Sequence, residues 1–418
     1  MAISDVKEYT HLTTEEVDQL GRELDALRAE VEESRGADDA AYINRIITIQ
    51  RRLAVAGRIT LFASRWRPAW VAGAAMLGVA KILENMEIGH NVMHGQWDWM
   101  NDPEIHSSTW EWDTAQPAEQ WKHSHNYVHH QFTNVLGHDN DIGYGILRMA
   151  HEQRWHPANL GQPVYNALLA TLFQWGVALH DLDLEAIRKR EKDPKVLAKQ
   201  LAQIKRKISR QIGKDYVFFP LLTAATGPAN VVPTITANAT ANLARNLWSY
   251  MIIFCGHFPD GALHFTEEEL EDETRAEWYL RQMLGSANFE GGRLLHVMSG
   301  QLGYQIEHHL FPDLPSNRYA QMSVRVRELA AKYDIPYTTG PLHRQYGQAL
   351  RTIMKLSLPN RFTATDQPAQ PGQATADTQV ERGRRTDAER PTRSAQTGDW
   401  YSRSSSGGSS RGSSGGAS

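Results

Sequence analysis

The sequence is poor in cysteine: its 418 residues contain only Cys255, which lies in an apolar run. A single cysteine cannot form a disulfide within the chain, so the cysteine content indicates no oxidising compartment. The N-terminus also lacks the short apolar core and the small-residue cleavage site of a secretory signal. The formal net charge is −4 and no groove of basic and aromatic residues is visible, which argues against nucleic acid as the main partner.

Runs of alternating polar and apolar residues, which are typical of half-buried strands, are scarce as well. We therefore expect an all-α protein. Long apolar stretches are present, and a helix that crosses a bilayer needs about 20 such residues. The candidate stretches are 68–90, 155–180, 216–244 and 240–258. They favour an integral-membrane helical bundle over a soluble bundle built on apolar core helices, which is the alternative.

Composition divides the chain into three parts. Residues 1–66 begin with an acidic, amphipathic segment, and Thr13 or Thr14 is the expected N-cap of a solvated helix. Residues 67–360 carry the apolar stretches and form the expected membrane domain. Residues 361–418 are rich in Ser, Gly, Arg, Gln, Thr and Pro and bury too little apolar surface to offset chain entropy, so we expect a disordered tail.

Charge predicts the side of the membrane that each loop occupies. The segment 181–214 contains eleven Lys or Arg against five Asp or Glu, which places it in the cytoplasm by the positive-inside tendency. We then expect 216–237 and 240–258 to form a hairpin that crosses and returns, and 163–180 to lie in the interface or re-enter. One evident span, 68–88, precedes the first histidine group. Either the stretch 46–66 enters the membrane or the N-terminal region is arranged unusually, and the residues leave both possibilities open.

Histidines gather in three short segments that apolar helices separate. The segment "HNVMH" contains His90 and His94, whereas "HNYVHH" contains His125, His129 and His130. Residues four apart lie on one face of a helix and can share one ion, and adjacent histidines diverge and reach toward two ions. The third segment, "QIEHH", ends in His308 and His309. Imidazole nitrogens suit iron, copper and zinc, so this pattern predicts a metal centre.

The pattern HxxxH, HxxxHH, QxxHH resembles that of the membrane fatty acid desaturases, within the integral-membrane di-iron desaturase and hydroxylase superfamily. The neighbouring residues are similar too: "HNYVHHQFTN" is followed by "HDNDIGYG", and the last segment reads "GQLGYQIEHHLFP". The similarity runs from about Ala69 to Pro315 and covers most of the chain before the tail. Its most specific part is the final segment, where Gln305 stands in place of a histidine, as in acyl-lipid and front-end desaturases.

The resemblance implies a di-iron site, an all-α membrane bundle with a cytoplasmic helical cap, and two irons bound by histidines. The three segments supply seven ligands, and an eighth is expected near the end of the last apolar helix, where His257 is preferred to His264. Ile253 stands where the branch with three all-histidine boxes has an asparagine. Gln305 is expected to hydrogen-bond a ligand or an iron-bound water. Metal-bound histidines need a partner for their other ring nitrogen, and the candidate carboxylates are Glu87, Asp139, Asp141 and Glu307.

The activity implied is the O₂-dependent desaturation of a long acyl chain, linked to CoA, carrier protein or lipid, with the histidines on the cytoplasmic face. Electrons are expected from a ferredoxin-, rubredoxin- or cytochrome-type carrier and its reductase, because the chain has no dinucleotide fingerprint and no HPGG haem motif. The basic segment 181–214 is the candidate docking surface for that carrier or for anionic headgroups. The alternatives are a hydroxylase or ketolase of the same superfamily and a membrane protein that only binds metal.

Overall fold

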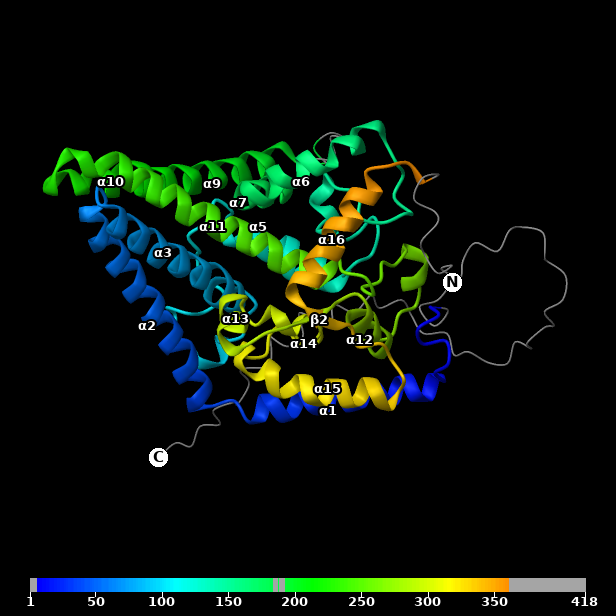
Figure 1. Ribbon diagram of the computed structural model, residues 1–418. Coiled ribbons are helices and arrows are strands. Elements are labelled where there is room, and N and C mark those ends of the chain that lie inside the picture. The colour runs from blue at the N-terminus through cyan, green and yellow to red at the C-terminus, as the bar shows by residue number, and fades with distance from the viewer. Residues whose placement is uncertain (1–5, 183–186, 188–191, 361–418) are drawn as a thin grey trace, which may run out of the picture. The chain divides into compact units, whose positions relative to one another are not determined.

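Helices form nearly all of the regular structure in the described part of the chain, which confirms the all-α prediction (Figure 1). The computed structural model describes residues 6–182, 187 and 192–360, all of which belong to one unit, Met1–Thr365. The tail expected to be disordered, 361–418, lies outside the described residues.

The helices differ widely in length, and several are interrupted by π-helical or 3-10 segments. The α-helices are α1 (Thr14–Glu33), α2 (Ala37–Thr60), α3 (Arg67–Leu83), α4 (Asn91–Met93), α5 (Ala118–Trp121), α6 (Gln162–Thr171), α7 (Phe173–His180), α9 (Pro194–Ile212), α10 (Phe219–Thr223), α11 (Val231–His257), α12 (Arg275–Leu284), α13 (Arg293–Met298), α14 (Gln305–Leu310), α15 (Tyr319–Lys332) and α16 (Leu342–Leu356). The π-helices are η3 (Glu84–His90), η5 (Lys122–His129) and η8 (Gly213–Phe218). The 3-10 segments are η2 (Leu61–Ala63), η4 (Asp98–Met100), η6 (Ile142–Gly145), η7 (Pro157–Gly161), η9 (Ala224–Thr226), η10 (Pro228–Asn230), η11 (Glu267–Leu270), η12 (Leu302–Tyr304) and η13 (Ser316–Arg318).

Two short strands accompany the helices. Strands β1 (Asn288–Glu290) and β2 (Thr339–Pro341) pair in parallel, with Asn288 opposite Thr339. The sequence predicts no strand here because a run of three residues is too short to show an alternating pattern. The pair joins the segment before the third histidine group to the start of α16.

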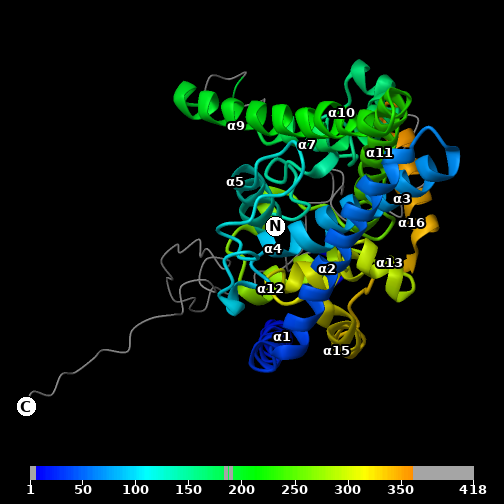
Figure 2. The same cartoon turned by 90° about the vertical axis from the view of Figure 1, so that its left-hand side faces the viewer.

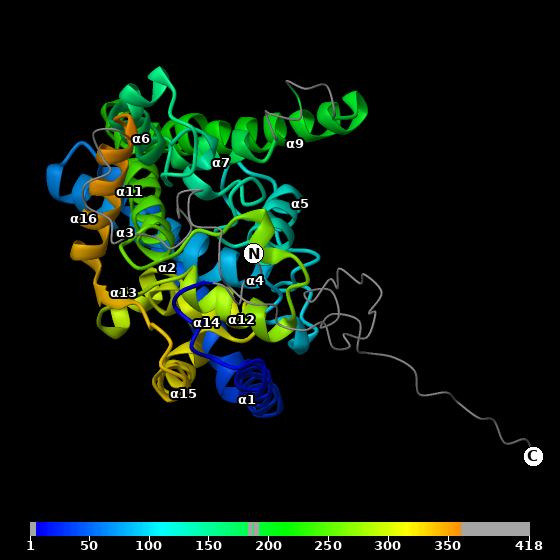
Figure 3. The ribbon, with the colours of Figure 1, turned by 90° about the vertical axis from the view of Figure 1, so that its right-hand side faces the viewer.

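Helix α1 begins at a capping box. The Thr13 hydroxyl accepts a hydrogen bond from the Glu16 N–H (3.2 Å), and the Glu16 carboxylate accepts one from the Thr13 N–H (2.8 Å). Of the two candidate threonines, Thr13 is therefore the N-cap. The buried face of α1, which includes Leu20 and Leu24, packs against α12 and α15, and Figures 1 and 3 show α1 and α15 side by side.

Helix α3 returns beside α2, so the first apolar helix is one half of a hairpin (Figures 1 and 2). Two glycines allow the backbones to approach: a Cβ on Gly73 would lie 2.6 Å from Leu61 Cδ2, and one on Gly57 would lie 2.9 Å from Leu77 Cγ. The stretch 46–66, whose arrangement the sequence leaves open, thus belongs largely to α2 and pairs with α3.

The hairpin predicted from 216–237 and 240–258 has its turn elsewhere, so the predicted boundaries are wrong. Helix α11 runs without interruption from Val231 to His257, and the chain reverses before it, at η9 and η10. Gly227 has a φ of 137°, which side-chain-bearing residues rarely adopt. Pro233 lies in the first turn of α11, where its missing N–H breaks no helical bond. The prolines thus mark the start of a helix rather than a kink within one.

The stretch 155–180 contains two short helices rather than one long one. Helices α6 and α7 meet at Leu172, whose φ and ψ of −107° and 24° are not helical. Among the described residues, no helix combines the length and the apolar character that crossing a membrane requires.

A buried carboxylate ties together the helices that lead to the site. Asp215 of η8 accepts from Arg58 Nη2 on α2 (2.7 Å) and from Lys81 Nζ on α3 (2.8 Å). Arg58 also donates to Asn238 on α11 (2.7 Å). Because a buried charge is stable only when it is paired and hydrogen-bonded, these contacts fix the positions of four helical segments relative to one another.

The C-terminal helices close the other side of the histidine segments. Helices α12, α14 and α15 share one apolar core with α1, which includes Leu280, Phe311 and Tyr319. Helix α14 lies between the α1–α15 layer and the α3–α11 pair (Figures 1 and 3). The third histidine segment is thereby held against the ends of α3 and α11.

Candidate metal centre

The first two histidine segments lie on π-helices rather than on regular α-helices. His90 ends η3, and His125 and His129 lie within η5. The sequence spacing predicts the regular i, i+4 face and a divergent His130. The wider π turn instead brings both His129 and His130 beside His125, with ring centroids at 5.0 and 4.9 Å. Single-turn π segments are frequent at functional sites, and here the segment explains how two adjacent histidines face one centre.

The other histidines come from separate elements. His94 follows α4, and its ring lies 4.6 Å from that of His90. His257 is the last residue of α11, and α14 carries His308 and His309. The histidines of the three segments and His257 are buried, with at most 8 % of the residue exposed, except His125, whose side chain is 16 % exposed.

The described imidazoles form two groups. Within each group, the possible ligand atoms, one from each residue, all lie within 4.8 Å of one another. The first group contains His90, His94, His125 and His308, and the second contains His129, His257 and His309. His130 lies between them, with its ring 4.9 Å from that of His308 and 4.4 Å from that of His309. The structure therefore brings together all eight histidines that the sequence and the resemblance single out.

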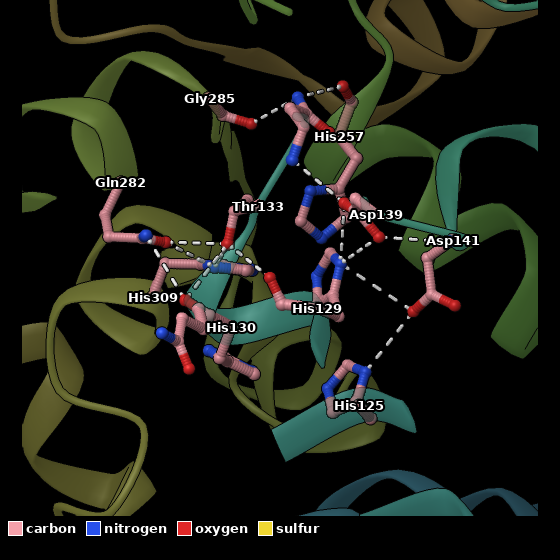
Figure 4. Close-up of polar contacts among 12 residues, drawn as sticks. His125, His129, His130, Thr133, Asp139, Asp141, His257, Gln282, Gly285 and His309 are labelled. Carbon is pink, nitrogen blue, oxygen red and sulfur yellow. Dashed lines mark hydrogen bonds and ion pairs between the residues drawn. The ribbon is translucent and has the colours of Figure 1, made fainter. Parts of the chain in front are cut away.

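Two of the four candidate carboxylates lie against these imidazoles. The carboxylate of Asp139 accepts from His129 Nδ1 at 3.0 Å, and the carboxylate of Asp141 lies 3.5 Å from His125 Nδ1 (Figure 4). Backbone N–H groups of Asn134 and Asp141 donate to Asp139 and hold it in place. Such carboxylates fix the orientation of a metal-binding imidazole and raise its basicity.

The other two carboxylates contact hydroxyl and amide groups. Glu87 accepts from the hydroxyls of Tyr42 and Ser316, each at 2.8 Å. Glu307 accepts from Tyr337 Oη and Asn288 Nδ2, each at 2.9 Å. Burial raises the pKa of Glu307 to about 7. These contacts connect the histidine segments to α2 and to the β1–β2 pair.

Several hydrogen-bond partners of the imidazole rings are not predicted from the sequence. His90 Nδ1 lies 3.0 Å from Asn91 Oδ1, and His308 Nδ1 lies 3.3 Å from Tyr319 Oη. His309 Nδ1 lies 3.0 Å from Gln282 Oε1, and Gln282 also accepts from Thr133 (Figure 4). Asn91 and Thr133 are near histidines in the sequence and could have been considered. Gln282 and Tyr319 are distant in the sequence and give no local signal.

His257 is fixed by the glutamine of the third segment. The Gln305 amide Nε2 lies 3.0 Å from His257 Nε2. A Cβ on Gly256 would come within 2.8 Å of Gln305 Cδ, so glycine is required for this approach. His264, the alternative to His257 in the sequence analysis, stacks on Phe258 at 6.2 Å. Of the two candidates, the structure brings His257 into contact with His129 and His309.

Burial holds most of these imidazoles neutral. Together with the nearby His125 it lowers the pKa of His90 to about 3, and it lowers the pKa values of His308 and His309 well below the usual range. Burial also disfavours charge on His129, but the carboxylate of Asp139 outweighs it and raises the pKa of that ring. Neutral imidazole is the form that binds metal, so these uncharged rings can donate nitrogen lone pairs to a cation without repelling it.

The donor set fits a transition metal. Ring nitrogens that no described residue satisfies face the middle of the cluster, although buried polar atoms are normally hydrogen-bonded. They are His125 Nε2, His130 Nδ1 and Nε2, His257 Nδ1, His308 Nε2 and His309 Nε2. Imidazole-rich sites favour iron, copper or zinc over magnesium or calcium. We conclude that the histidine groups are of a metal-binding type.

A cavity adjoins the histidines. His90, His125, His129 and His257 form part of its wall. Ile253, Phe258, Phe173, Tyr144 and Val177 make the neighbouring wall apolar and aromatic. A mainly apolar cavity beside a metal-binding cluster is suited to holding a hydrocarbon chain for oxidation.

Comparison with known proteins identifies the family. Residues 64–341 match the sequence profile described as fatty acid desaturase, which is more than half of the chain. The chain belongs to the fatty acid desaturase family. The match spans all three histidine segments, so the metal-binding cluster and the cavity belong to an enzyme that desaturates fatty acyl chains.

This desaturase is similar in sequence to desaturases of two types, one that acts on an acyl-CoA and one that acts on a lipid-linked chain. It is 55 % identical over 362 residues to an NADPH-dependent stearoyl-CoA 9-desaturase of Mycobacterium tuberculosis, covering 87 % of this chain and 85 % of that protein. It is 24 % identical over 336 residues to an sn-1 linoleoyl-lipid 6-desaturase of Synechocystis, covering 77 % of this chain and 89 % of the relative. Both relatives are desaturases, which favours desaturation over the hydroxylase, ketolase and metal-binding alternatives.

Proposed function

We propose that this desaturase introduces a double bond at position 9 of stearoyl-CoA or a closely similar acyl-CoA. The observation that carries the proposal is the 55 % identity, over 87 % of the chain, to an enzyme with that reported substrate and position. The 6-desaturase that acts on a lipid-linked chain is far less similar, at 24 %. The 9-desaturase of Mycobacterium tuberculosis is NADPH-dependent, so we propose that the electrons used by this enzyme originate from NADPH.

We propose that two irons occupy the two histidine groups. His90, His94, His125 and His308 would hold one ion, and His129, His257 and His309 the other, with His130 between them. When bound, iron supplies the activation of O₂ and the removal of hydrogen from unactivated methylenes, chemistry that no side chain performs unaided. Neutral imidazoles provide the donor atoms, and Asp139 and Asp141 keep two of the rings oriented.

The residues of the cavity would bind and orient the acyl chain. Phe173, Tyr144 and Ile253 surround the space next to the histidines, exclude water from it and hold the chain by shape. A saturated chain has no polar group near its middle, so position along the cavity alone decides which carbons react. The selection of one bond thus depends on where the two ends of the chain lie.

The electrons would reach the centre from a separate carrier protein. The chain contains no dinucleotide-binding fingerprint and no HPGG motif, so NADPH itself would be used by a reductase. Helix α9 exposes Lys195, Lys199, Lys205, Arg206 and Arg210. These residues are exposed members of the basic segment 181–214 and would attract an acidic carrier or anionic headgroups.

We propose that the helices that lead away from the site contact a bilayer. Large apolar side chains are exposed along them, and single exposed apolar residues are ordinary whereas a broad apolar surface is not. They include Ile49, Val55 and Ile59 on α2, Val71 on α3, Leu221 and Leu222 on α10, and Val232, Leu243 and Leu247 on α11. Because α2 and α3 form a hairpin, the histidines and the start of α2 would lie on the same, cytoplasmic side.

The product of the reaction tests the proposal. The chain would be expressed with an NADPH-dependent electron donor in a host that lacks 9-desaturase activity, and the double bond located by mass spectrometry. We expect a 9-unsaturated acyl chain that disappears in His129→Ala and remains in His123→Ala, since His123 is exposed and stacks on Tyr127 away from the two groups. A hydroxylated product, or a double bond elsewhere, would overturn the assignment.

A further inference from the structure

One face of α11 follows the cavity from the histidines to its far end. His257, Ile253 and Ser249 are spaced four apart, and Asn246 and Arg245 follow three and four positions further along. Residues with this spacing lie on one side of a helix. At 1.5 Å per residue, Arg245 lies about 18 Å along the helix axis from His257. Each position on this face therefore corresponds to a fixed distance from His257 along the helix axis.

The character of the wall changes along this face. Close to His257 the cavity is lined by the apolar side chains of Ile253 and Phe258. Further along, Ser249 Oγ donates to Asn85 Oδ1 at 2.7 Å, which joins α11 to η3. Asn246 donates from its amide to the carbonyl of Thr171 (2.9 Å). An apolar section thus gives way to a polar one about two helical turns from His257.

The polar section ends at a buried guanidinium that is only partly bonded. Arg245 is 1 % exposed, yet its Nη2 donates to Asn246 Oδ1 (3.1 Å) and its Nη1 reaches the carbonyl of Asp113 only at 3.4 Å. With the described residues it forms no ion pair within 4.0 Å. A guanidinium carries five N–H donors, so several remain for whatever fills the cavity.

This end of the cavity is closed. Arg245, Asn246 and Ser249 are each at most 4 % exposed. A bulky, charged acyl carrier needs an opening to solvent, and the side of the cavity at Asp141 is more exposed, at 18 % of that side chain. The closed end must therefore receive the methyl terminus of a bound chain. A methyl group that reached Arg245 would remove water from the charge without giving it a hydrogen bond, which is unfavourable.

We propose that Arg245 sets the maximum length of the acyl chain through its charge, and that Ser249 sets the width of the last section before it. The inference rests on the proposed function and adds to it the residues that select chain length. The limit is one of solvation: a longer chain would press its methyl end against a guanidinium to which it offers no hydrogen bond.

The test compares acyl-CoA substrates that differ only in length. The enzyme, loaded with metal and supplied with an electron donor, would be given myristoyl-, palmitoyl-, stearoyl- and arachidoyl-CoA separately, and kcat/KM measured for each. We expect Arg245→Met to raise the ratio of arachidoyl to stearoyl turnover roughly tenfold, the size of effect that one or two methylenes have in an apolar pocket. Ser249→Leu should narrow the section and shift preference toward myristoyl and palmitoyl chains.

Leu247→Phe is the matched control, because Leu247 is on the same helix but 41 % exposed, away from the cavity. Its length profile should equal that of the unmodified enzyme. Unchanged profiles in both folded cavity variants would overturn the proposal, and if Arg245→Met does not fold, Ser249→Leu decides alone. If the unmodified enzyme forms no product, that result contradicts the proposed function but not the proposal about chain length. The length profile is then read from the shift of the unfolding midpoint that each acyl-CoA causes, with the same two outcomes.

Discussion

At the scale of single residues, the centre depends on side chains that are buried and neutral together. An imidazole cluster without solvent favours the uncharged rings, and each uncharged ring offers a nitrogen to a metal. The exception is His129, whose ring is paired with Asp139. Asp139 and Asp141 lie against the rings of His129 and His125, and a carboxylate in that position orients an imidazole that binds metal.

Asp139→Asn should weaken metal binding without unfolding the chain. The amide keeps one oxygen for one of the two backbone N–H groups, those of Asn134 and Asp141, and loses the charge beside His129. Loss of a carboxylate partner of a metal-bound histidine typically lowers metal affinity by about 10- to 100-fold. Metal content would be measured by elemental analysis after dialysis against increasing chelator, with the exposed Asp334→Asn as control. Equal metal retention in both variants would show that Asp139 does not support the ligand.

At the scale of helices, close contact between α2 and α3 positions the first histidine segment. The hairpin relies on glycine where the two backbones meet, at Gly57 and Gly73. Asp215 then joins the hairpin to the following helices through Arg58 and Lys81. Because η3 continues directly from α3, any shift of the hairpin is transmitted to His90.

Gly73→Ala should destabilise the protein by about 1–3 kcal/mol, the usual effect of overpacking a tight contact. The new methyl group would lie 2.6 Å from Leu61 Cδ2 and also close to the carbonyl of Gly57, which cannot move aside easily. The midpoint of thermal unfolding measures the change. Gly213→Ala is the control, since a Cβ there meets nothing within 4 Å. A midpoint as high for Gly73→Ala as for Gly213→Ala would show that the helices can separate freely.

The sequence predicts the helices better than it predicts their local geometry. The histidine spacing predicts that His125 and His129 lie on one face of a helix, and their rings stack at 5.0 Å, although they fall into different histidine groups. The π turns of η3 and η5 depend on packing that spacing does not encode. The turn before α11 is misplaced because the stretch from 216 to 258 is apolar on both sides of η9 and η10, so hydropathy does not mark where the chain reverses. The contacts of Gln282 and Tyr319 with histidines join segments far apart along the chain, and no local pattern predicts them.

At the scale of the whole described unit, N-terminal and C-terminal helices are joined by partly buried ion pairs. Arg28 on α1 donates to Asp313 just after α14 (2.6 and 2.8 Å). Asp39 on α2 accepts from Arg318 Nε (2.6 Å) and from Asn317 (2.7 Å). These pairs hold the layer of α1 and α15 against the third histidine segment.

Stability should therefore depend on pH through Asp39. Burial opposes its ionisation, but the hydrogen bonds from Arg318 and Asn317 outweigh burial and lower its pKa. A lowered pKa in the folded state contributes stability above the unfolded-state pKa of about 4 and loses that contribution as the pH falls through the folded-state pKa. At neutral pH, Asp39→Asn should cost about 1–3 kcal/mol, since it leaves charged donors without an anion.

The difference in unfolding free energy between the unmodified chain and Asp39→Asn should shrink as the pH is lowered below about 4. The neighbouring Asp38→Asn changes an exposed carboxylate and is the control, with an expected effect within about 0.5 kcal/mol. A difference that stayed constant down to acidic pH would show that Asp39 is not ionised in the folded protein.

Both histidine groups include one residue of α14: His308 completes the first, and His309 the second. Neither group can be complete before the ribosome has synthesised the chain as far as these two residues. In the proposed arrangement neither metal site could therefore form on a nascent chain that ends before α14. A chain truncated before α14 would lose both proposed metal sites at once.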